Sequence, residues 1–320
     1  MALGVIWGLP YLLIRVAVRD VSPAFLVFVR TAGGAVLLAP FAARSGVFSR
    51  VLKFWRPLAI YTVVEIAVPW WLLSTAEKRI TSSLSGLLVS AVPLAGAVIA
   101  RVTGTDRIDR QRAAGLVLGV AGVAALVGFD VGGGDVWALS SFLVIITGYA
   151  LGPWILSRYF PDLPGIVVVE ASLVLAALIY APVAVLQHPA RVPSAGALAS
   201  LAGLSVACTA VAFVAFFGLI KEVGPMRATV VTYLNPAVAV VLGVTVLGEH
   251  FGPATGGGFV LVLAGSFLAT RPLTVRSAVG AAETTVAAET TGAAGTTGAA
   301  GATAVSVRAA VEAQASGAEP

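Results

Sequence analysis

The stretch that decides the fold occurs twice. Residues 78–101 read KRITSSLSGLLVSAVPLAGAVIAR, and residues 221–244 read KEVGPMRATVVTYLNPAVAVVLGV. Lys78 aligns with Lys221 at an offset of 143 residues, and Pro93 aligns with Pro236 without a gap. Glycines also match further on, Gly115 with Gly258 and Gly122 with Gly265. We interpret the match as an internal duplication; chance similarity between two stretches of common membrane composition is the alternative.

The composition indicates that the protein folds in a lipid bilayer rather than in water. Hydrophobic residues make up 58% of the chain, charged residues 11%, and the mean hydropathy is +0.98, whereas about a quarter of residues are charged in ordinary soluble domains. A helix of about 20 apolar residues crosses a bilayer and satisfies its own backbone there. Continuous rather than alternating hydrophobicity excludes a transmembrane β-barrel. The sequence therefore predicts an all-α integral membrane protein with ten transmembrane helices.

The ten expected spans divide evenly between two halves. In order they are 2–18, 24–41, 57–75, 82–102, 113–129, 136–156, 165–186, 195–220, 228–247 and 254–269. The first repeat is expected to cover residues 1–129 and the second repeat residues 136–270. Residues 277–320 are rich in Ala, Thr, Gly and Glu, so they cannot bury enough apolar surface to fold. They are expected to form a disordered cytoplasmic tail.

Lysine and arginine are unevenly divided between the expected loops. If the N-terminus is cytoplasmic, 13 of these residues lie on the inside and 4 on the outside, the latter being Arg19, Lys78, Arg79 and Arg191. Positive charge in short loops directs membrane insertion. Both termini are therefore expected in the cytoplasm, and the cell membrane is the expected location.

An odd number of helices in each copy should invert one half relative to the other. The loop at Asp106 would then face the cytoplasm, and the loop at Glu249 would face outside. Two inverted halves can exchange conformations, which gives an inward-open and an outward-open state around a central site. This parity favours a secondary transporter that works by alternating access. An accidental duplication in a protein that moves nothing is the alternative.

Four ionisable residues lie inside the expected spans: Arg15, Arg30, Glu65 and Glu170. Each costs about 2.5 to 3.5 kcal/mol at a helix centre, so such residues face the bundle interior and mark a pathway. Arg15 is close enough to the end of its span to extend to the interface. Arg30 and Glu170 are expected to line the cavity and bind polar substrate groups or each other in alternate states. A permanent ion pair between them is the alternative.

Glu65 is the candidate coupling residue. Desolvation inside the bundle favours its protonated form, which suits a carboxylate that exchanges protons. Substrate binding and a structural hydrogen bond or salt bridge are the alternatives. The two positive and two negative charges balance, which favours a zwitterionic or neutral substrate over a strongly charged one.

Two prolines occupy matching places in the repeats. Pro93 and Pro236 each remove a backbone donor and free a carbonyl within a predicted helix. A hinge or cavity role is expected for both, with tolerance by packing as the alternative. Asn235 adds a neutral hydrogen-bonding group at a similar depth, and we expect it to contribute to substrate binding.

Several stretches resemble EamA-type transporters of the drug/metabolite transporter superfamily. Trp7-Gly8-Leu9-Pro10 continuing to Arg15 is similar to the family's first helix, and Arg30 to the arginine common in its second helix. Gly248-Glu249 resembles the family's loop acid, whereas the first repeat has Gly104-Thr105-Asp106 in place of the usual Gly-Glu pair. The resemblance covers about residues 5–270. It implies ten helices, two EamA repeats and transport of small metabolites.

Other function classes lack their motifs. The sequence has no phosphate-binding Gly-Lys-Ser/Thr loop, no Gly-x-Ser-x-Gly motif and no His-Glu-x-x-His motif. Cys208 is the single cysteine, and His188 and His250 stand apart in the sequence, so neither a metal nor a cofactor is expected. Membrane orientation explains the excess of arginine without a nucleic-acid partner.

The expected partners are therefore the lipid bilayer and a small-molecule substrate. The protein could act as a monomer or a homodimer. The chain is not expected to be an enzyme. A membrane-embedded enzyme that uses Glu65 and Glu170 as a carboxylate pair is one alternative, and a structural or lipid-scrambling protein is another.

Overall fold

The computed structural model describes residues 2–104, 109–130, 136–223 and 233–270, apart from the side chains of residues 127, 129 and 130. These residues form helices and short connections and contain no β-strand. The helices are α1 Ala2–Ala17, α2 Pro23–Arg44, α3 Phe48–Lys53, α4 Trp55–Tyr61, η1 Thr62–Ala67, α5 Val68–Ala76, α6 Ser82–Val89, α7 Val92–Val102, α8 Arg110–Asp130, α9 Val136–Tyr159, α10 Gly165–Leu186, α11 Ala195–Ser205, η2 Val206–Val211, α12 Ala212–Val223, α14 Asn235–Leu247 and α15 Pro253–Ala269.

Membrane-spanning length is clear for six helical stretches of the described chain. They are Pro23–Arg44, Trp55–Ala76, Ser82–Val102, Val136–Tyr159, Gly165–Leu186 and Ala195–Val223. The helices α1, α14 and α15 are apolar but shorter. An all-helical membrane protein is thus what the structure presents. That the chain crosses the membrane ten times stays a prediction. Three of the predicted features lie outside the described residues: residues 228–232 of the ninth expected span, Asp106 and the expected tail.

Local sequence signals set the starts of several helices. Ser22, Thr81 and Ser194 each precede a helix, and their side-chain oxygens accept hydrogen bonds from the backbone N–H groups three residues on, each at 3.2 Å. Such N-caps satisfy donors that the first turn leaves free. At the end of α14, Gly248 adopts φ +67°, a left-handed conformation that favours glycine.

Three expected spans are interrupted, which the sequence reading did not foresee. The third and eighth spans each contain a turn of π-helix, η1 between α4 and α5 and η2 between α11 and α12. The fourth span breaks at Ser90 and Ala91, between α6 and α7. Single π-helical turns inside α-helices occur frequently at functional sites. The interruptions therefore mark where the bundle departs from simple membrane helices.

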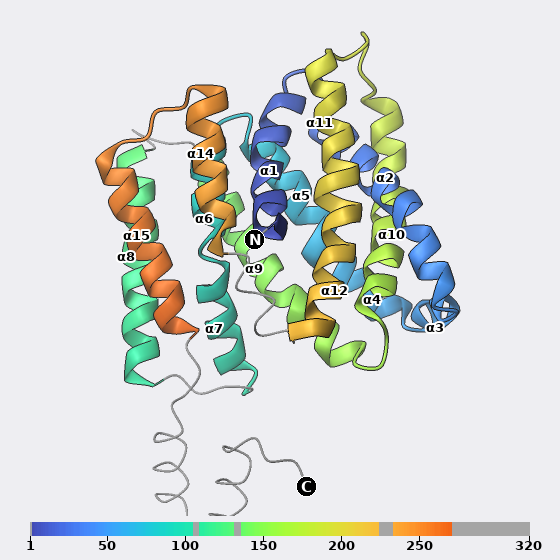
Figure 1. Cartoon of the computed structure of the whole chain (residues 1–320), viewed down its shortest axis with the longest axis horizontal. Helices are drawn as coiled ribbons and strands as arrows, with labels where there is room; N and C mark the ends of the chain where they lie inside the picture. Colours follow the sequence, from blue (N-terminus) through green and yellow to red (C-terminus); the bar gives the residue numbers. More distant parts are fainter. Residues whose placement is uncertain (1, 105–108, 131–135, 224–232, 271–320) are drawn as a thin grey trace, which may run out of the picture. The chain divides into compact units, whose positions relative to one another are not determined.

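The helices pack in pairs that are distant in sequence. Figure 1 shows α8 beside α15 at one edge of the bundle and α2 beside α10 towards the other, with α1, α5 and α9 between them. In addition, α14 packs against both α1 and α6, and α9 packs against both α5 and α7. The centre of the bundle is therefore enclosed by helices from both halves of the chain.

Glycines bring α8 and α15 into close contact. A Cβ atom on Gly115 would lie 2.8 Å from the carbonyl oxygen of Gly265, and a Cβ atom on Gly122 would lie 2.9 Å from that of Gly258. In the sequence repeat Gly115 aligns with Gly258 and Gly122 with Gly265. In the structure the contacts are exchanged, so that Gly115 lies against Gly265 and Gly122 against Gly258. Small residues allow membrane helices to approach this closely.

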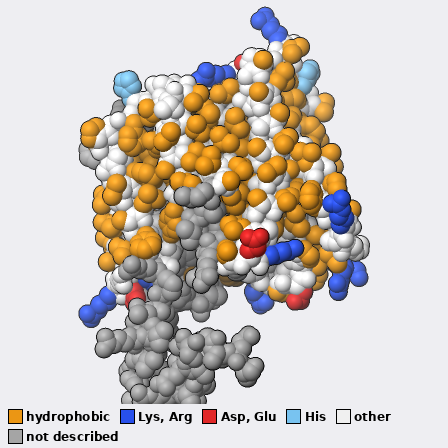
Figure 2. Space-filling view, in the orientation of Figure 1, with side chains coloured by type: hydrophobic (Ala, Val, Ile, Leu, Met, Phe, Trp, Pro, Cys, Tyr) orange, Lys and Arg blue, Asp and Glu red, His pale blue; other side chains and the backbone are white. Residues whose placement is uncertain are grey.

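The surface carries an apolar band between two charged ends. In Figure 2 hydrophobic side chains cover the visible face, while Lys and Arg side chains lie at the upper and lower ends. Large apolar residues are widely exposed within the band, for example Val36 at 73%, Val117 at 71% and Leu178 at 66%. Such exposure suits contact with lipid rather than water.

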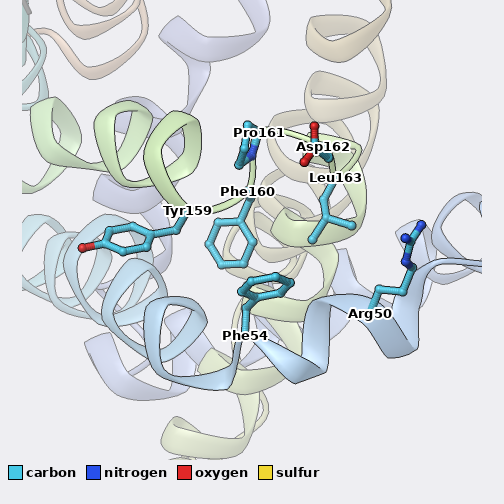
Figure 3. Close-up of a pocket in the computed structure, with 7 residues that line it drawn as sticks. All are labelled: Arg50, Phe54, Tyr159, Phe160, Pro161, Asp162 and Leu163. Atoms are coloured by element: carbon cyan, nitrogen blue, oxygen red, sulfur yellow. The ribbon is translucent and has the colours of Figure 1, made fainter.

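A pocket opens at one charged end, where α3 and the following turn meet the connection between α9 and α10 (Figure 3). We call it the α3 pocket, and it is lined by Arg50, Phe54, Tyr159, Phe160, Pro161, Asp162 and Leu163. Phe54 and Phe160 pack edge to face at 6.0 Å between ring centroids.

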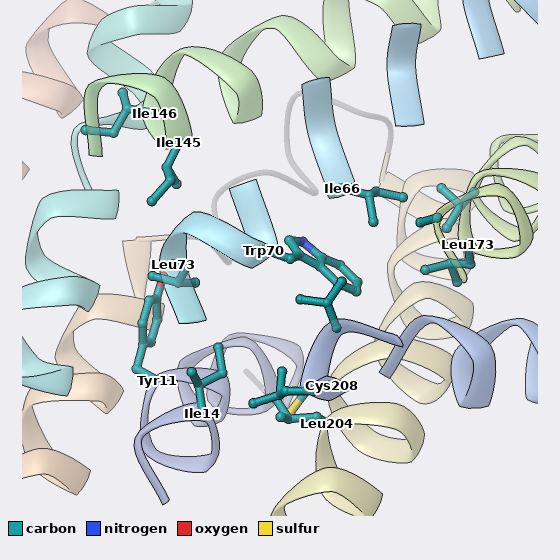
Figure 4. Packing of buried hydrophobic residues seen from close by; sticks show 14 of the residues in the cluster. Tyr11, Ile14, Ile66, Trp70, Leu73, Ile145, Ile146, Leu173, Leu204 and Cys208 are labelled. Carbon is teal, nitrogen blue, oxygen red and sulfur yellow. The ribbon is translucent and has the colours of Figure 1, made fainter. Parts of the chain in front are cut away.

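The core of the bundle is a continuous apolar cluster around Trp70 of α5. Figure 4 shows Trp70 among side chains of several helices, including Tyr11 of α1, Leu173 of α10 and Cys208 of η2. Trp70 is 6% exposed. Arg30, one of the predicted site residues, lies against Trp70 and so beside this cluster.

Candidate functional site

Arg30 is a buried cation at the centre of the bundle. Its side chain is only 6% exposed, and its guanidinium carbon lies 3.6 Å from the centroid of the Trp70 ring. The Nε atom donates a hydrogen bond of 3.1 Å to Oγ1 of Thr209 in η2. A stacked, desolvated cation–π contact stabilises the charge by about 2 kcal/mol. Arg30 is thus held by one aromatic face and one hydroxyl group.

Thr209 owes its position to the π-helical turn. Its Oγ1 donates a hydrogen bond of 2.8 Å to the carbonyl oxygen of Leu204, five residues earlier. The close approach of α2 depends on Gly34, because a Cβ atom there would lie 2.5 Å from Cγ2 of Thr209. The η2 turn and a glycine of α2 together place the acceptor for Arg30.

Glu65 lies in the other π-helical turn, η1. Its carboxylate rests against Gly152 of α9, where an added Cβ atom would clash with it. The Oε2 atom is buried and has no hydrogen-bond partner among the described residues. The hydroxyl group of Tyr180 in α10 donates a hydrogen bond of 2.9 Å to the carbonyl oxygen of Ala67, the last residue of η1. The protein therefore braces the turn but leaves one carboxylate oxygen unsatisfied.

Glu170 is buried in α10 at 5% exposure, and its Oε2 atom also has no hydrogen-bond partner within the described chain. Although α2 and α10 pack together, the structure shows no ion pair between Arg30 and Glu170 in the residues it describes. Arg30 uses Thr209 and Trp70 instead. Arg30 bonds to Thr209 rather than to Glu170 because η2, which interrupts the eighth span, places the Thr209 hydroxyl group within hydrogen-bond distance of its guanidinium.

Glu77 is a central acid that the sequence reading missed. It follows α5 and precedes Lys78 and Arg79, which were expected in an outer loop, yet it is fully buried at 0% exposure. Neither carboxylate oxygen has a hydrogen-bond partner in the part of the chain that the structure describes. Arg15 and Arg30 both lie close enough to interact with it electrostatically. Within the described residues, the carboxyl groups of Glu65, Glu77 and Glu170 thus lie inside the bundle together with the guanidinium of Arg30.

Arg15 does not simply extend to the interface, as the sequence suggested. Its guanidinium donates a hydrogen bond to the backbone carbonyl oxygen of Glu77. This contact joins the end of α1 to the end of α5. Arg15 therefore ties the two helices together next to the buried acid.

Pro93 and Pro236 sit at helix starts rather than within continuous helices. Each occupies the first turn, of α7 and α14 respectively, where a proline costs no hydrogen bond. At the break before α7, the hydroxyl group of Ser266 in α15 donates a hydrogen bond of 3.2 Å to the carbonyl oxygen of Ser90. Asn235 begins α14, and its backbone carbonyl faces Gly8 of α1.

Polar contacts join the connections at one end of the bundle. Asp20 accepts a hydrogen bond of 2.8 Å from the backbone N–H of Ser194, and the pKa of Asp20 is lowered by its hydrogen bonds with Ser194. Glu249 accepts bonds of 2.8 and 2.9 Å from the backbone N–H groups of Ser82 and Ser83, and a third of 2.6 Å from the Ser83 hydroxyl. Burial alone would raise the pKa of Glu249, but these hydrogen bonds lower it overall. The carboxylate of Glu249 thereby caps α6.

A metal-binding cluster of three or more His, Cys, Asp or Glu side chains does not occur in the described residues. Cys208 is buried and unpaired in η2.

Comparison with known proteins identifies the family. The profile of the EamA-like transporter family matches residues 1–128 and again residues 134–271. The chain belongs to the EamA-like transporter family. The resemblance noted in the sequence is thereby confirmed, and this EamA-family protein is a multi-pass membrane transporter.

Individual relatives agree with the family assignment. The chain is 29% identical over 255 residues to an "Uncharacterized inner membrane transporter YedA" of Escherichia coli, covering 78% of this chain and 81% of the relative. It is 23% identical over 283 residues to a chloroplastic WAT1-related protein of Arabidopsis thaliana, covering 83% and 67%. A protein crystal structure shares the fold with a TM-score of 0.62 and 19% identity, covering 84% of this chain and 94% of that one.

Proposed function

We propose that this EamA-family protein is a secondary transporter of small zwitterionic metabolites that works by alternating access. In this proposal two inverted five-helix repeats, residues 1–129 and 136–270, move about the buried polar residues, and the protein is not an enzyme. The observation that carries it is Arg30, a buried cation whose protein contacts are an aromatic ring and a hydroxyl group.

Paired features of the two halves support the inverted repeat. The π-helical turns η1 and η2 begin 144 residues apart, one residue from the sequence offset. The contact of α1 with α14 has its counterpart in that of α9 with α7. The reciprocal glycine contacts between α8 and α15 follow the same rule. A pseudo-two-fold relation of this kind would allow the halves to exchange conformations.

The need of Arg30 for an anion supports substrate binding at this place. No carboxylate lies within ion-pair distance of Arg30 in the described residues, and an uncompensated buried charge is costly. A substrate carboxylate would satisfy the guanidinium, whose planar fork suits bidentate binding. Glu77 lies close enough to interact electrostatically with Arg30 but makes no ion pair with it among the described residues. A guanidinium and a carboxyl group within electrostatic reach of each other suit the two ends of a zwitterion, with Glu170 and Asn235 as further polar groups near the substrate.

Glu65 is the proposed coupling residue. Its unsatisfied, desolvated oxygen in η1 is the environment in which a carboxyl group takes up a proton.

The proposed orientation places both termini in the cytoplasm. In support, the end that carries Arg19, Lys78, Arg79 and Arg191 has fewer cationic residues than the opposite end, whose described cationic residues are Arg44, Arg50, Lys53, Arg56, Arg101, Arg110, Arg112, Arg158 and Lys221.

Uptake into proteoliposomes tests the proposal. A panel of zwitterionic, neutral and dicarboxylate compounds would be assayed with and without a pH gradient, using the wild type and Arg30→Gln. We expect saturable uptake of a zwitterion that Arg30→Gln abolishes and that the control Arg191→Gln, on an exposed loop, retains. A preference for dicarboxylates, or full activity of Arg30→Gln, would contradict the assigned substrate class.

Topology is tested separately by cysteine labelling. Because Cys208 is the single cysteine, Cys208→Ser gives a cysteine-free background. Thr103→Cys and His250→Cys are both at exposed positions, and an impermeant thiol reagent added to intact cells should label only His250→Cys. Labelling of both from the same side would refute the inverted arrangement.

A further inference from the structure

The α3 pocket lies at the boundary between the apolar band and the charged end that carries α3. Figure 3 shows Phe54 and Phe160 packed in its centre, with Arg50 at one edge and Tyr159 at the opposite edge. Phe160 is 3% exposed and forms the buried base of the pocket, whereas Phe54 is 46% exposed. The pocket therefore has an aromatic floor with a cationic edge at this end of the bundle.

Arg50 lines the pocket, and further cationic side chains belong to the helices that form it. Arg50 and Lys53 belong to α3, Arg56 follows in α4, and the guanidinium of Arg158 lies 6.0 Å from the centroid of the Tyr159 ring. Within the described chain, the side chains of Arg50 and Lys53 have neither a hydrogen-bond nor an ion-pair partner. Asp162 is the acid in the lining. This edge thus presents net positive charge that the protein itself does not neutralise.

Large apolar side chains next to the same cations are exposed. Leu52 is 51% exposed and Trp55 is 62% exposed, next to Lys53 and Arg56 respectively. Tryptophan at this depth is typical of the membrane–water interface. Basic pockets between transmembrane helices bind anionic lipid headgroups. Both halves of such a lipid, the phosphate and the acyl chains, would therefore find complementary groups here.

We propose that the α3 pocket binds the headgroup of an anionic phospholipid. The phosphate lies between Arg50 and Lys53, and the acyl chains run along Leu52 and Trp55. Asp162 repels the phosphate from the far side of the pocket and so restricts it to the α3 edge. This inference goes beyond the transport proposal, because it requires only that the protein sits in a bilayer.

Native mass spectrometry of the purified full chain tests the proposal. The protein in detergent is titrated with a phosphatidylglycerol and, separately, with a phosphatidylcholine of the same acyl chains. Each Lys or Arg near a lipid surface changes anionic lipid binding by about fivefold. We expect Arg50→Gln with Lys53→Gln to weaken phosphatidylglycerol binding by at least about tenfold and to leave phosphatidylcholine binding unchanged. Asp162→Asn should strengthen phosphatidylglycerol binding.

Two comparisons decide the outcome. Arg191→Gln, which removes an exposed charge at the other end of the bundle, should leave phosphatidylglycerol binding unchanged. Equal weakening by Arg191→Gln, or undiminished binding by the α3 double variant, would overturn the proposal. Displacement of the lipid by millimolar inorganic phosphate would show that the pocket binds a soluble anion rather than a lipid headgroup, and this result would overturn the proposal as well. Elution of each variant as a single folded species in size-exclusion chromatography validates the comparison.

Discussion

Gly265 lies where α15 and α8 approach each other closely, and its replacement by alanine tests the helix contact. A Cβ atom at this position would lie 2.5 Å from the Cα atom of Gly119 and 2.6 Å from the carbonyl oxygen of Gly115. Both are backbone atoms, which cannot rotate away as the end of a side chain can. Because non-bonded carbon atoms rest at about 3.5 to 4.0 Å, the two helices would have to separate by about 1 Å.

The magnitude follows from two opposing terms. Overpacking of a tight interface costs about 1 to 3 kcal/mol, whereas alanine is favoured over glycine in a helix by about 1 kcal/mol. We expect Gly265→Ala to lower the free energy of unfolding by about 1 to 2 kcal/mol, because the backbone clash belongs at the upper end of the first range. Because the unfolding entropy is about 2.1 cal/mol/K per residue, the melting temperature of a protein of this size would fall by about 2 to 4 °C.

Thermal unfolding in detergent can be followed with a dye that fluoresces on reaction with a thiol, since Cys208 is buried and is the single cysteine. The matched control is Gly257→Ala in the same helix, because no atom lies within 4 Å of its added Cβ. This control should keep the wild-type melting temperature or raise it by the helix propensity alone. A Gly265→Ala protein that melts no lower than the wild type, or an equal fall in the control, would refute the reasoning.

Three further predictions concern the polar groups. Arg30→Lys keeps the charge but loses the stacked planar face and the bond to Thr209, so we expect kcat/KM for uptake in proteoliposomes to fall at least about tenfold; activity close to the wild type would argue against the fork geometry. Glu65→Gln should remove the stimulation of uptake by a pH gradient, and an unchanged gradient dependence would eliminate Glu65 as the coupling group. Glu249→Gln weakens the cap on α6 and should lower the free energy of unfolding by about 1 kcal/mol at neutral pH. The lowered pKa of Glu249 stabilises the folded protein above the ordinary carboxyl range, and this contribution is lost as the pH falls through the lowered pKa. The wild type and Glu249→Gln should therefore converge in stability at acidic pH.

The cap itself provides the control for the last prediction. Ser83→Ala removes the hydroxyl that donates to Glu249 but leaves the backbone N–H groups of Ser82 and Ser83 in place. Its effect should therefore be smaller than that of Glu249→Gln. A stability difference that persists unchanged to low pH would show that the charge of Glu249 is not responsible.

Much of the architecture could be predicted because it depends on local composition and period. The limits of the second and tenth spans, for example, differ from α2 and α15 by at most three residues, since a stretch of apolar residues forms a helix wherever lipid surrounds it. The match of Gly115 with Gly258 and of Gly122 with Gly265 could likewise be found from the sequence alone. The structure adds that they contact one another.

The membrane class, most helix limits and the buried status of Arg30 and Glu170 were determined by the sequence alone, because hydrophobicity and helical period act over one or two turns. The π-helical turns, the burial of Glu77 and the choice of Thr209 as the partner of Arg30 were decided only by the tertiary structure. Arg30 and Thr209 are 179 residues apart, and no local pattern specifies which hydroxyl group meets a given guanidinium. Such contacts exist only once distant helices pack, because their geometry depends on where each helix bends and how closely its neighbours approach.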